Sequence, residues 1–592
     1  MKKLLSLLVI TLILALTLSS CTFIQGAFFK YEVRFDLNGG VGGADFSESV
    51  TVKHGKTVSM PIPTRDNYTF MGWYADGELY TSTTPITNDA VLKAEWSFNE
   101  TYKITYNTNG KGAEVPADFV KLGTLPQIPA APQVEGYVFA GWYLDEALTE
   151  RYYFDYALDA DTTLHANFYD TQLGEYIVIS TFEQLMAIKD DPAAKYLLAC
   201  DINCHGEAIT PIDEFTGELH GNGYKIYDFT ISDTTNISGF IRTNKGTIKD
   251  LTFKDFVMDV LVNSSANKNY GVICGINEGI IDNCGTVDGT MKVDAVTSGK
   301  DVTYYVYIGG LVGHNKGSVV SSKSQTSMNI IAVSSGVSGL TKRYVYTNID
   351  VGGIVGVNDK SSSIDSCENY SDIKVITDAV SYAAPAMNGY IWTFVDSNII
   401  VGGIAGHNYA NIDRSISVGD IDVKIEHIHH AANNQHNENE VLRIYSGSAV
   451  GINKGKIYNC YTTGDVIIHE GVKVCVVGAF AGYNELVSGY SAMINKCFSM
   501  GSITVDNVPT NCGYFVGKTN GTEKYCYYLD SVTINQNTVV DEVETIVALE
   551  PTTNVGEAKT IEELLSADFI LNTLNFDRME WFIVDGKLPE LR

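Results

Sequence analysis

Residues 309–315 read Gly-Gly-Leu-Val-Gly-His-Asn, and this short glycine motif recurs along the chain. Close copies occupy residues 352–358 (Gly-Gly-Ile-Val-Gly-Val-Asn) and 402–408 (Gly-Gly-Ile-Ala-Gly-His-Asn). Looser copies surround Asn244, Asn277, Asn453, Asn484 and Asn520. The motif asparagines follow one another at intervals of 31 to 50 residues. A motif that returns at such intervals is typical of stacked supersecondary units, each of which buries a face of its neighbour.

Each repeat contains about three predicted strands, of which the glycine motif is the first. After Asn453, the second strand is predicted over residues 456–461 and the third over 465–468. Short strands with glycine at the corners predict a parallel β-helix, because glycine permits the bend and the close approach of neighbouring coils. The leucine spacing of a leucine-rich horseshoe, the competing solenoid, is absent from the sequence. The motif resembles the GLUG repeat of bacterial surface proteins, and we assign residues 176–592 to such a domain with its caps.

The two ends of this predicted rod need caps, since an end coil would otherwise expose unpaired strand edges. An amphipathic segment over residues 181–189 predicts a short helix at the first end. At the far end, residues 561–565 and 581–589 resemble the tails that close GLUG domains.

Four consecutive repeats carry insertions in one position, at residues 292–308, 328–350, 373–400 and 423–446. Insertions on one side of a repeat array often form its binding face. Each insertion resembles a hairpin with an aromatic return strand. Its aromatic residues stand an odd number of residues before the second residue of the next glycine motif. Because side chains alternate along a strand, we expect all of these rings on one face. Two interpretations stay open. The rings extend the core, since Leu311, Ile354 and Ile404 share their parity, or they form an exposed ledge. As a ledge they are the candidate ligand-binding residues Tyr305, Tyr307, Tyr344, Tyr346, Tyr390, Trp392, Phe394 and Tyr445.

Cysteines follow the repeats in the same way. They stand six to thirteen residues after a motif asparagine, and Ser415 takes the equivalent place after Asn408; the cysteines are Cys284, Cys367, Cys460, Cys497 and Cys526. Stacked coils would align them in an inward ladder of small residues, which we expect to hold free buried thiols. Disulfides are the alternative outside the cytoplasm, with Cys200 and Cys204 as a candidate pair.

Before the rod, residues 31–97 and 102–170 form two similar modules. Each module has an alternating strand that ends in an Asn-Gly turn and, later, a Gly-Trp-Tyr segment. The tryptophans of these two segments, Trp73 and Trp142, are 69 residues apart. Alternation bounded by such turns predicts small antiparallel β units. The pattern resembles the Listeria–Bacteroides repeat, which implies β-grasp-like modules in tandem. We expect both tryptophans in the module cores rather than as ligand platforms.

The first residues are typical of a secretion signal. Two lysines precede an apolar run that is too short to span a membrane, and Leu18-Ser19-Ser20-Cys21 resembles the lipobox of bacterial lipoproteins. The resemblance implies a signal peptide over 1–20, lipid attachment at Cys21 and a linker over 21–30. The protein would then be an extracytoplasmic, surface-exposed protein held to the cell membrane by lipid, because its acidic body cannot bind anionic lipid by charge.

Several functions are disfavoured by composition and motifs. The chain carries 41 Lys and Arg against 70 Asp and Glu, a net charge of −29, which argues against nucleic acid as a partner. His469 and Glu470 lack the second histidine of a zinc peptidase motif. A polar segment with Glu426, His427, His429, His430, His436, Glu438 and Glu440 offers metal-ligand types, but such segments are usually only solvated. We therefore predict no catalytic residues, no metal and no cofactor.

The sequence as a whole predicts a mainly β protein with two small modules and a parallel β-helix with short helical caps. Its predicted function is that of an adhesin or binding module for a protein or a polysaccharide at the cell surface. Two alternatives stay open: an enzyme that cleaves acidic polysaccharide, and a structural spacer without a ligand.

Overall fold

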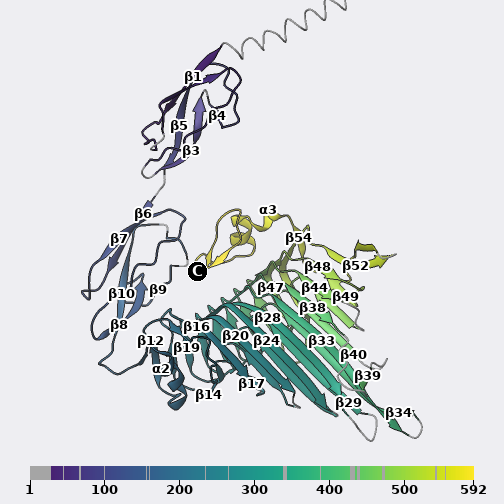
Figure 1. Cartoon of the computed structure of the whole chain (residues 1–592). Helices are drawn as coiled ribbons and strands as arrows, with labels where there is room; N and C mark the ends of the chain where they lie inside the picture. The colour runs from purple at the N-terminus through teal and green to yellow at the C-terminus, as the bar shows by residue number, and fades with distance from the viewer. Residues whose placement is uncertain are drawn as a thin grey trace, which may run out of the picture. The chain divides into compact units, whose positions relative to one another are not determined.

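The computed structural model describes residues 29–592 apart from short gaps (Figure 1); the gaps are 44–45, 66–67, 76, 99–100, 155, 159, 234, 264–265, 300, 338–342, 387–388, 427–433, 436–440, 470–473, 541–542 and 554. Cys21 and the histidines of the polar segment, His427, His429, His430 and His436, lie outside the described residues. The chain divides into two compact units, which are described separately. The first holds residues up to 134 with 141–167, and the second holds 135–140 with 168–592.

The two N-terminal repeats form two five-stranded sheets with the same strand order. The first has the order β2-β1-β5-β3-β4 and the second β7-β6-β10-β8-β9. Their strands are β1 (Lys30–Asp36), β2 (Ser49–Lys53), β3 (Tyr68–Ala75), β4 (Glu78–Tyr80), β5 (Ala90–Phe98), β6 (Thr101–Asn107), β7 (Val115–Lys121), β8 (Tyr137–Tyr143), β9 (Arg151–Tyr152) and β10 (Thr162–Asp170). The prediction of purely antiparallel units is wrong, because β1 pairs with β5 and β6 with β10 in parallel. Trp73 and Trp142 are 1% and 2% exposed, which confirms that they are core residues.

The second unit is a parallel β-helix whose coils contribute to four stacks of strands. The first stack holds the glycine motifs: β14 (Ile212–Phe215), β18 (Ile241–Asn244), β22 (Cys274–Asn277), β26 (Val312–Asn315), β30 (Val355–Asn358), β35 (Ala405–Asn408), β41 (Val450–Asn453), β46 (Ala481–Asn484) and β50 (Val516–Thr519). The second stack holds short strands: β15 (Glu218–His220), β19 (Thr247–Lys249), β23 (Ile280–Asp282), β27 (Ser318–Val320), β31 (Ser363–Asp365), β36 (Asn411–Asp413), β42 (Lys456–Tyr458), β47 (Met493–Ser499) and β51 (Thr522–Leu529).

The third and fourth stacks contain the longest strands. The third holds β16 (Lys225–Asp233), β20 (Thr252–Asn263), β24 (Gly285–Gly299), β28 (Lys323–Gly336), β32 (Glu368–Asn369), β33 (Ile373–Ala386), β37 (Ile416–Ser417), β38 (Ile421–Ile425), β43 (Tyr461–Thr462), β44 (Val466–His469), β48 (Ile503–Val505) and β52 (Ile534–Val540). The fourth holds β17 (Ile237–Ser238), β21 (Lys268–Gly271), β25 (Val302–Gly309), β29 (Arg343–Gly352), β34 (Gly389–Gly402), β40 (Val441–Gly447), β45 (Val474–Gly478) and β49 (Asn511–Gly513).

The predicted hairpin is present in the insertion at 373–400, where β33 and β34 pair antiparallel, but the insertions do not stand apart from the rod. Their strands continue the third and fourth stacks and pair in parallel with the neighbouring coils, as β24 does with β28 and β29 with β34. A second small core of Tyr304, Val345, Ala379 and Val395 fills the extended part, so the coils grow wider in the middle of the rod, where β29, β33 and β34 reach outward (Figure 1).

A ladder of buried asparagines runs along the motif stack. The side-chain Nδ2 of each asparagine donates to Oδ1 of the next at 2.8–2.9 Å, through Asn244, Asn277, Asn315, Asn358, Asn408, Asn453 and Asn484. All seven are fully buried. An amide can form such a ladder because it is both donor and acceptor. Asn520, which the sequence indicated as the asparagine of an eighth motif copy, is not in the ladder, since Thr519 pairs with Asn484 and Asn520 is exposed.

The glycines of the motif are required by close approach between backbones. A Cβ atom on Gly309 would lie 1.9 Å from the carbonyl oxygen of Val312, closer than any side chain permits. The chain turns at this point, where its strand in the fourth stack ends and its motif strand in the first stack begins.

The predicted ladder of small residues is present. It includes Ser322, which the sequence did not indicate. Cys284 and Cys367 have serine neighbours, since their backbone N–H groups donate to Oγ of Ser322 and Ser415 at 3.1 and 3.2 Å. The N–H of Ser415 in turn donates to Sγ of Cys460. The ten described cysteines are free, so the candidate disulfide between Cys200 and Cys204 is wrong.

The first cap matches its prediction, whereas the C-terminal tail lies elsewhere. Strands β11 (Ile177–Ile179), β12 (Lys195–Leu198) and β13 (Ile202–Asn203) begin the rod beside helix α2 (Phe182–Met186) and the 3₁₀ turn η1 (Ala187–Asp190). Thr181 and Gln184 form a capping box that fixes the start of α2. At the other end, β52 turns back antiparallel into β53 (Val543–Ala548), and β54 (Glu557–Lys559) pairs with β51.

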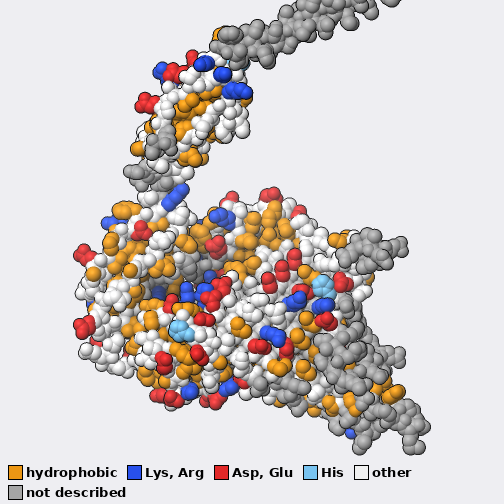
Figure 2. Space-filling view, viewed as in Figure 1, with side chains coloured by type: hydrophobic (Ala, Val, Ile, Leu, Met, Phe, Trp, Pro, Cys, Tyr) orange, Lys and Arg blue, Asp and Glu red, His pale blue; other side chains and the backbone are white. Residues whose placement is uncertain are grey.

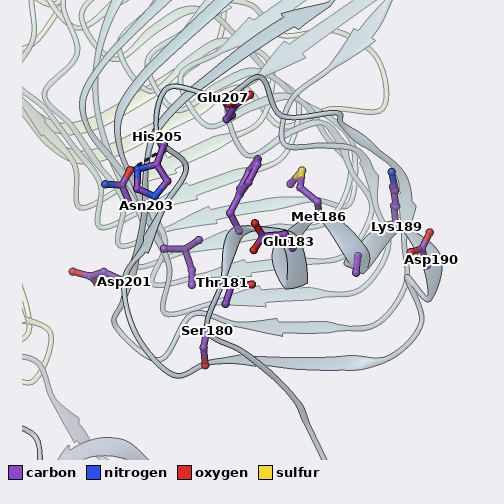
Figure 3. Close-up of a pocket in the computed structure, with 13 residues that line it drawn as sticks. Ser180, Thr181, Glu183, Met186, Lys189, Asp190, Asp201, Asn203, His205 and Glu207 are labelled. Carbon is purple, nitrogen blue, oxygen red and sulfur yellow. Dashed lines mark hydrogen bonds between the residues drawn. The ribbon is translucent and has the colours of Figure 1, made fainter.

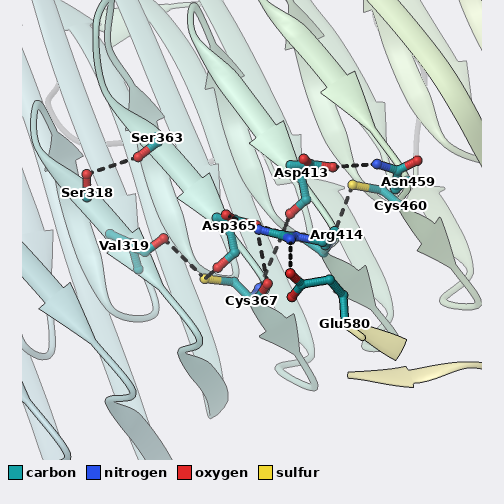
Figure 4. Close-up of polar contacts among 12 residues, drawn as sticks. Ser318, Val319, Ser363, Asp365, Cys367, Asp413, Arg414, Asn459, Cys460 and Glu580 are labelled. Carbon is teal, nitrogen blue, oxygen red and sulfur yellow. Dashed lines mark hydrogen bonds and ion pairs between the residues drawn. The ribbon is translucent and has the colours of Figure 1, made fainter. Parts of the chain in front are cut away.

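The tail after β54 packs on the flank of the rod instead of across its end. It contains α3 (Ile561–Leu564), the π-helix η2 (Phe569–Thr573), β55 (Trp581–Phe582) and β56 (Glu590–Leu591). Trp581 is buried with Tyr461 and Phe498, which come from two successive coils. Glu580 contacts Arg414 at 2.8 Å, and Arg414 also binds Asp365 of the preceding coil (Figure 4). The flank attracts the tail because its outward side chains are apolar there.

We predict that Asn358→Leu lowers the free energy of unfolding by about 2–4 kcal/mol, because Nδ2 of Asn315 loses its ladder acceptor and Oδ1 of Asn408 loses its ladder donor in the buried interior. Asn520→Leu, at the exposed position, should change stability by about 0.5 kcal/mol or less. Urea denaturation followed by circular dichroism measures both values. Equal effects of the two variants would contradict the ladder.

We also predict that iodoacetamide at pH 8 modifies Cys200, which is half-buried, and leaves the buried thiols intact until denaturant is added. Burial raises the pKa of Cys204, Cys367 and Cys526 to about 12, so almost no thiolate is present. Peptide mass spectrometry identifies the labelled residues. Rapid native labelling of Cys367, or a thiol that stays blocked in denaturant without reductant, would disagree with this account.

Candidate functional site

The predicted aromatic residues lie on the outward face of the fourth stack. Tyr390 is 59% exposed and Tyr346 45%, and Tyr305 and Tyr344 are also exposed. Tyr307, Trp392 and Tyr445 are half-buried, and Phe394 is buried. The interpretation that all eight rings extend the core therefore fails for the four exposed tyrosines and holds for Phe394, while the three half-buried rings lie between the two interpretations. Its parity argument fails because the strand does not run unbroken into the motif but turns at Gly309.

The register of the parallel strands divides the eight residues into two groups. Tyr305 lies beside Asn348 and Tyr307 beside Asp350, rather than beside the tyrosines of β29. Tyr344 lies beside Phe394, while Tyr445 lies beside Ile400 at the other end of β34. A ring that stands an odd number of residues before the second residue of the next motif therefore lies on the outward face. Two rings of neighbouring coils lie side by side only when these numbers are equal.

The first group, the distal aromatic patch, consists of Tyr344, Tyr346, Tyr390, Trp392 and Phe394. Its rings form a continuous series across β29 and β34. The ring centroids of Tyr344 and Tyr346 are 6.2 Å apart, those of Tyr344 and Phe394 are 5.8 Å apart, and those of Trp392 and Phe394 are 5.8 Å apart. Tyr390 continues the series at 6.2 Å from Trp392. Exposed aromatic rings that contact one another form an apolar surface of the kind that marks binding sites.

The second group lines a cleft between the outward faces of the fourth and first stacks, which we call the outer cleft. It has a volume of about 300 Å³. Tyr305, Tyr307 and Tyr445 contribute to it from the predicted set. The other lining residues are Asn348, Asp350, Val357, Asn398, His407, Tyr409, Ile452, Lys454, Tyr483 and Glu485.

Two buried polar residues occupy the angle between the two walls of the outer cleft. Nδ1 of His407 lies 3.3 Å from Oδ1 of Asp350, and the residues are 7% and 2% exposed. Burial lowers the pKa of His407, so the ring is neutral at pH 7. We place the proton on Nδ1, the nitrogen nearer the Asp350 carboxyl group, which leaves Nε2 as an acceptor. Nε2 has no hydrogen-bond partner among the described residues.

The remaining polar side chains of the outer cleft are paired with one another. Nδ2 of Asn398 donates to Oδ1 of Asn348 at 2.7 Å. Nζ of Lys454 lies 3.3 Å from Glu485 and 5.1 Å from the centre of the Tyr409 ring. The Tyr409 ring stacks on His407 with their centroids 4.3 Å apart. Burial raises the pKa of Tyr307, Tyr409 and Tyr445, so their hydroxyl groups stay protonated and able to donate.

Sequence reasoning missed most of these polar residues, although a signal for them existed. Asn348 and Asp350 have the same odd offset from Gly353 as the tyrosines that were singled out. His407 and Tyr409 flank the motif asparagine Asn408, so they face outward when Asn408 faces inward. Extending the parity argument from aromatic to polar residues would have found them.

A larger, open depression lies beside the first cap, with a volume of about 890 Å³. Glu183 and Met186 of α2 face His205 and Glu207 across it (Figure 3). In the described part of the chain, no three His, Cys, Asp or Glu side chains are arranged to hold a metal ion. His469, of the rejected zinc motif, contacts Asp422 and Asp506 instead. Among the described residues, no helix is long and apolar enough to cross a membrane.

Two segments of the chain match a known family. Residues 31–95 and 102–167 match the model of the Listeria-Bacteroides repeat domain, and they correspond to the two five-stranded sheets. This match confirms the resemblance that the sequence predicted for the two modules.

Relatives share part of the chain. A protein named "Putative membrane protein" from Evansella cellulosilytica is 35% identical over 143 residues, which are 23% of this chain and 20% of that protein. Internalin H from Listeria monocytogenes is 31% identical over 149 residues, 23% of this chain and 25% of its own length. The chain thus spans a quarter or less of the length of these relatives.

A solved structure titled as a putative immunoglobulin A1 protease from Bacteroides ovatus covers 70% of this chain and 91% of its own. It is 14% identical with a TM-score of 0.26, which is too low to support a conclusion about fold or activity.

Proposed function

We propose that the protein is a cell-surface lipoprotein that binds a protein or polysaccharide through the outward face of its β-helix. The observation that carries this proposal is the distal aromatic patch, whose exposed members are Tyr344, Tyr346 and Tyr390. Exposed rings cost solubility, and aromatic residues contribute much of the binding energy at interfaces. The relatives named as a membrane protein and an internalin support a place at the cell surface.

The parts of the chain have complementary roles in this proposal. Lipid on Cys21 would hold the chain at the membrane, the two repeat modules would act as a stalk, and the GLUG-like rod would present the binding face. Acidic and basic side chains are interspersed over the visible surface (Figure 2), which supports a partner that is not a polyanion such as nucleic acid.

Binding is favoured over cleavage by the pairing of the acidic groups in the outer cleft. Glu485 is engaged by Lys454, and Asp350 by His407. An adjacent cation favours the ionised form of a carboxyl group, which cannot donate a proton as a general acid. A spacer without ligand gains nothing from an exposed aromatic surface, so the patch also favours binding over that alternative.

The anchor is tested by Cys21→Ser. In bacteria that express the variant, we expect the protein to leave the membrane fraction, because an acidic body has no other attraction to anionic lipid. Cys200→Ser is the matched control and should stay membrane-bound. Fractionation followed by immunoblotting measures the distribution. If Cys21→Ser remains in the membrane fraction, the attachment is elsewhere.

The binding face is tested with Tyr390→Ala and Tyr346→Ala in residues 29–592 coupled to beads. Retention on layers of epithelial and bacterial cells should fall roughly tenfold, the equivalent of about 1.4 kcal/mol, while the melting temperature stays nearly unchanged. Tyr370→Ala removes a tyrosine that is 44% exposed outside the patch and serves as control. By contrast, Phe394→Ala should cost roughly 3–5 kcal/mol of stability. Unaltered retention of both tyrosine variants would contradict the proposed face.

A further inference from the structure

We infer that the outer cleft is a binding site for an uncharged saccharide. This inference rests on the proposed binding function and names the class of its ligand. It is carried by three properties of the cleft: its ring surfaces, its hydrogen-bonding groups and its charge.

The ring surfaces of the outer cleft suit a flat ligand with one apolar face. Tyr305 and Tyr307 lie on one wall, with ring centroids 6.0 Å apart. Tyr445 and Tyr483 come from the two different walls and stack with their centroids 6.4 Å apart. A pyranose ring presents C–H groups on its faces and hydroxyl groups around its edge, so it can pack on such rings while its edge reaches polar groups.

The polar groups of the outer cleft require a ligand that both donates and accepts hydrogen bonds. Nε2 of His407 is an acceptor that is buried and has no partner in the described structure. The amides of Asn348 and Asn398 share one bond, and Oδ1 of Asn398 also accepts from Arg443 at 3.2 Å; each amide still has an N–H that these bonds do not use. A hydroxyl group can donate to the imidazole and accept from an amide at the same time. An apolar peptide side chain would leave these groups unsatisfied, and each such group costs binding energy.

The charge of the outer cleft disfavours an acidic saccharide. Among the described residues that line it, Lys454 is the only cation, and its ammonium group is already neutralised by Glu485 at 3.3 Å. Asp350 adds a second carboxylate. Two basic residues contact the lining residues from outside and are themselves paired: Arg443, which bonds Asn398, pairs with Asp396, and His314, which packs on Tyr307, hydrogen-bonds Asp359 at 3.0 Å. A uronate or sulfate group would meet carboxylates without a free cation, in a chain whose net charge is −29.

An array of immobilised neutral, uronate, sialylated and sulfated glycans tests the inference on residues 29–592. We expect the wild-type protein to bind neutral glycans and no acidic ones. Tyr305→Ala removes an exposed ring of the cleft, and Asn398→Ala removes an amide, so each should weaken binding roughly tenfold. Tyr370→Ala is the control and should bind as the wild type does. Melting temperatures verify that each variant is folded.

The outcomes separate this inference from the proposed function. Binding to acidic glycans, or to no glycan at all, overturns the saccharide inference, while adhesion to cells through Tyr390 would still support the proposed function. Glycan binding that is lost in Tyr390→Ala but kept in both cleft variants places the saccharide on the distal aromatic patch and overturns the cleft assignment. Shortening of bound neutral glycans, measured by mass spectrometry, would overturn binding without cleavage.

Discussion

The hydrogen bond from one asparagine amide to the next is the interaction on which the rest of the β-helix depends. The ladder runs from Asn244 to Asn484 through seven buried side chains. Each bond forms only when the asparagines of neighbouring coils occupy equivalent positions in their strands. Burying an amide without this partner would be costly, since its donor and acceptor would both lose water. The ladder therefore fixes the register of the motif strands and, through them, of every coil.

A fixed register has a consequence for the outer surface. Because the coils stay aligned, residues at equal distances from the motif lie side by side, as Tyr307 and Asp350 do. The wall of the outer cleft is built in this way from four coils that are far apart in sequence. Lengthening of β24, β28, β33 and β34 then adds surface beyond the cleft, and the distal aromatic patch occupies part of it.

Electrostatics separate the inside of the rod from its surface. Inside, thiols, amides and hydroxyls form the ladders, and burial keeps thiols such as Cys367 protonated. Outside, many cations stand beside carboxylates, as Arg414 does between Asp365 and Glu580. Such pairs contribute little to stability where they are exposed. Their effect at the outer cleft is on selectivity, since the one cation among the described lining residues, Lys454, is paired with Glu485.

The sequence by itself determined the repeat, the β-helix, the ladder of cysteine and serine side chains and the shared face of the aromatic residues, whereas the asparagine ladder emerged from the structure. The former follow from motif spacing and from alternation along a strand, which are local properties. Only the tertiary structure decided that the insertions are continuous strands, that the tail covers the flank, and that Tyr305 lies beside Asn348 rather than beside Tyr346. These features depend on pairing between coils whose lengths differ, and a difference of a few residues changes which side chains meet without altering the pattern within any one repeat.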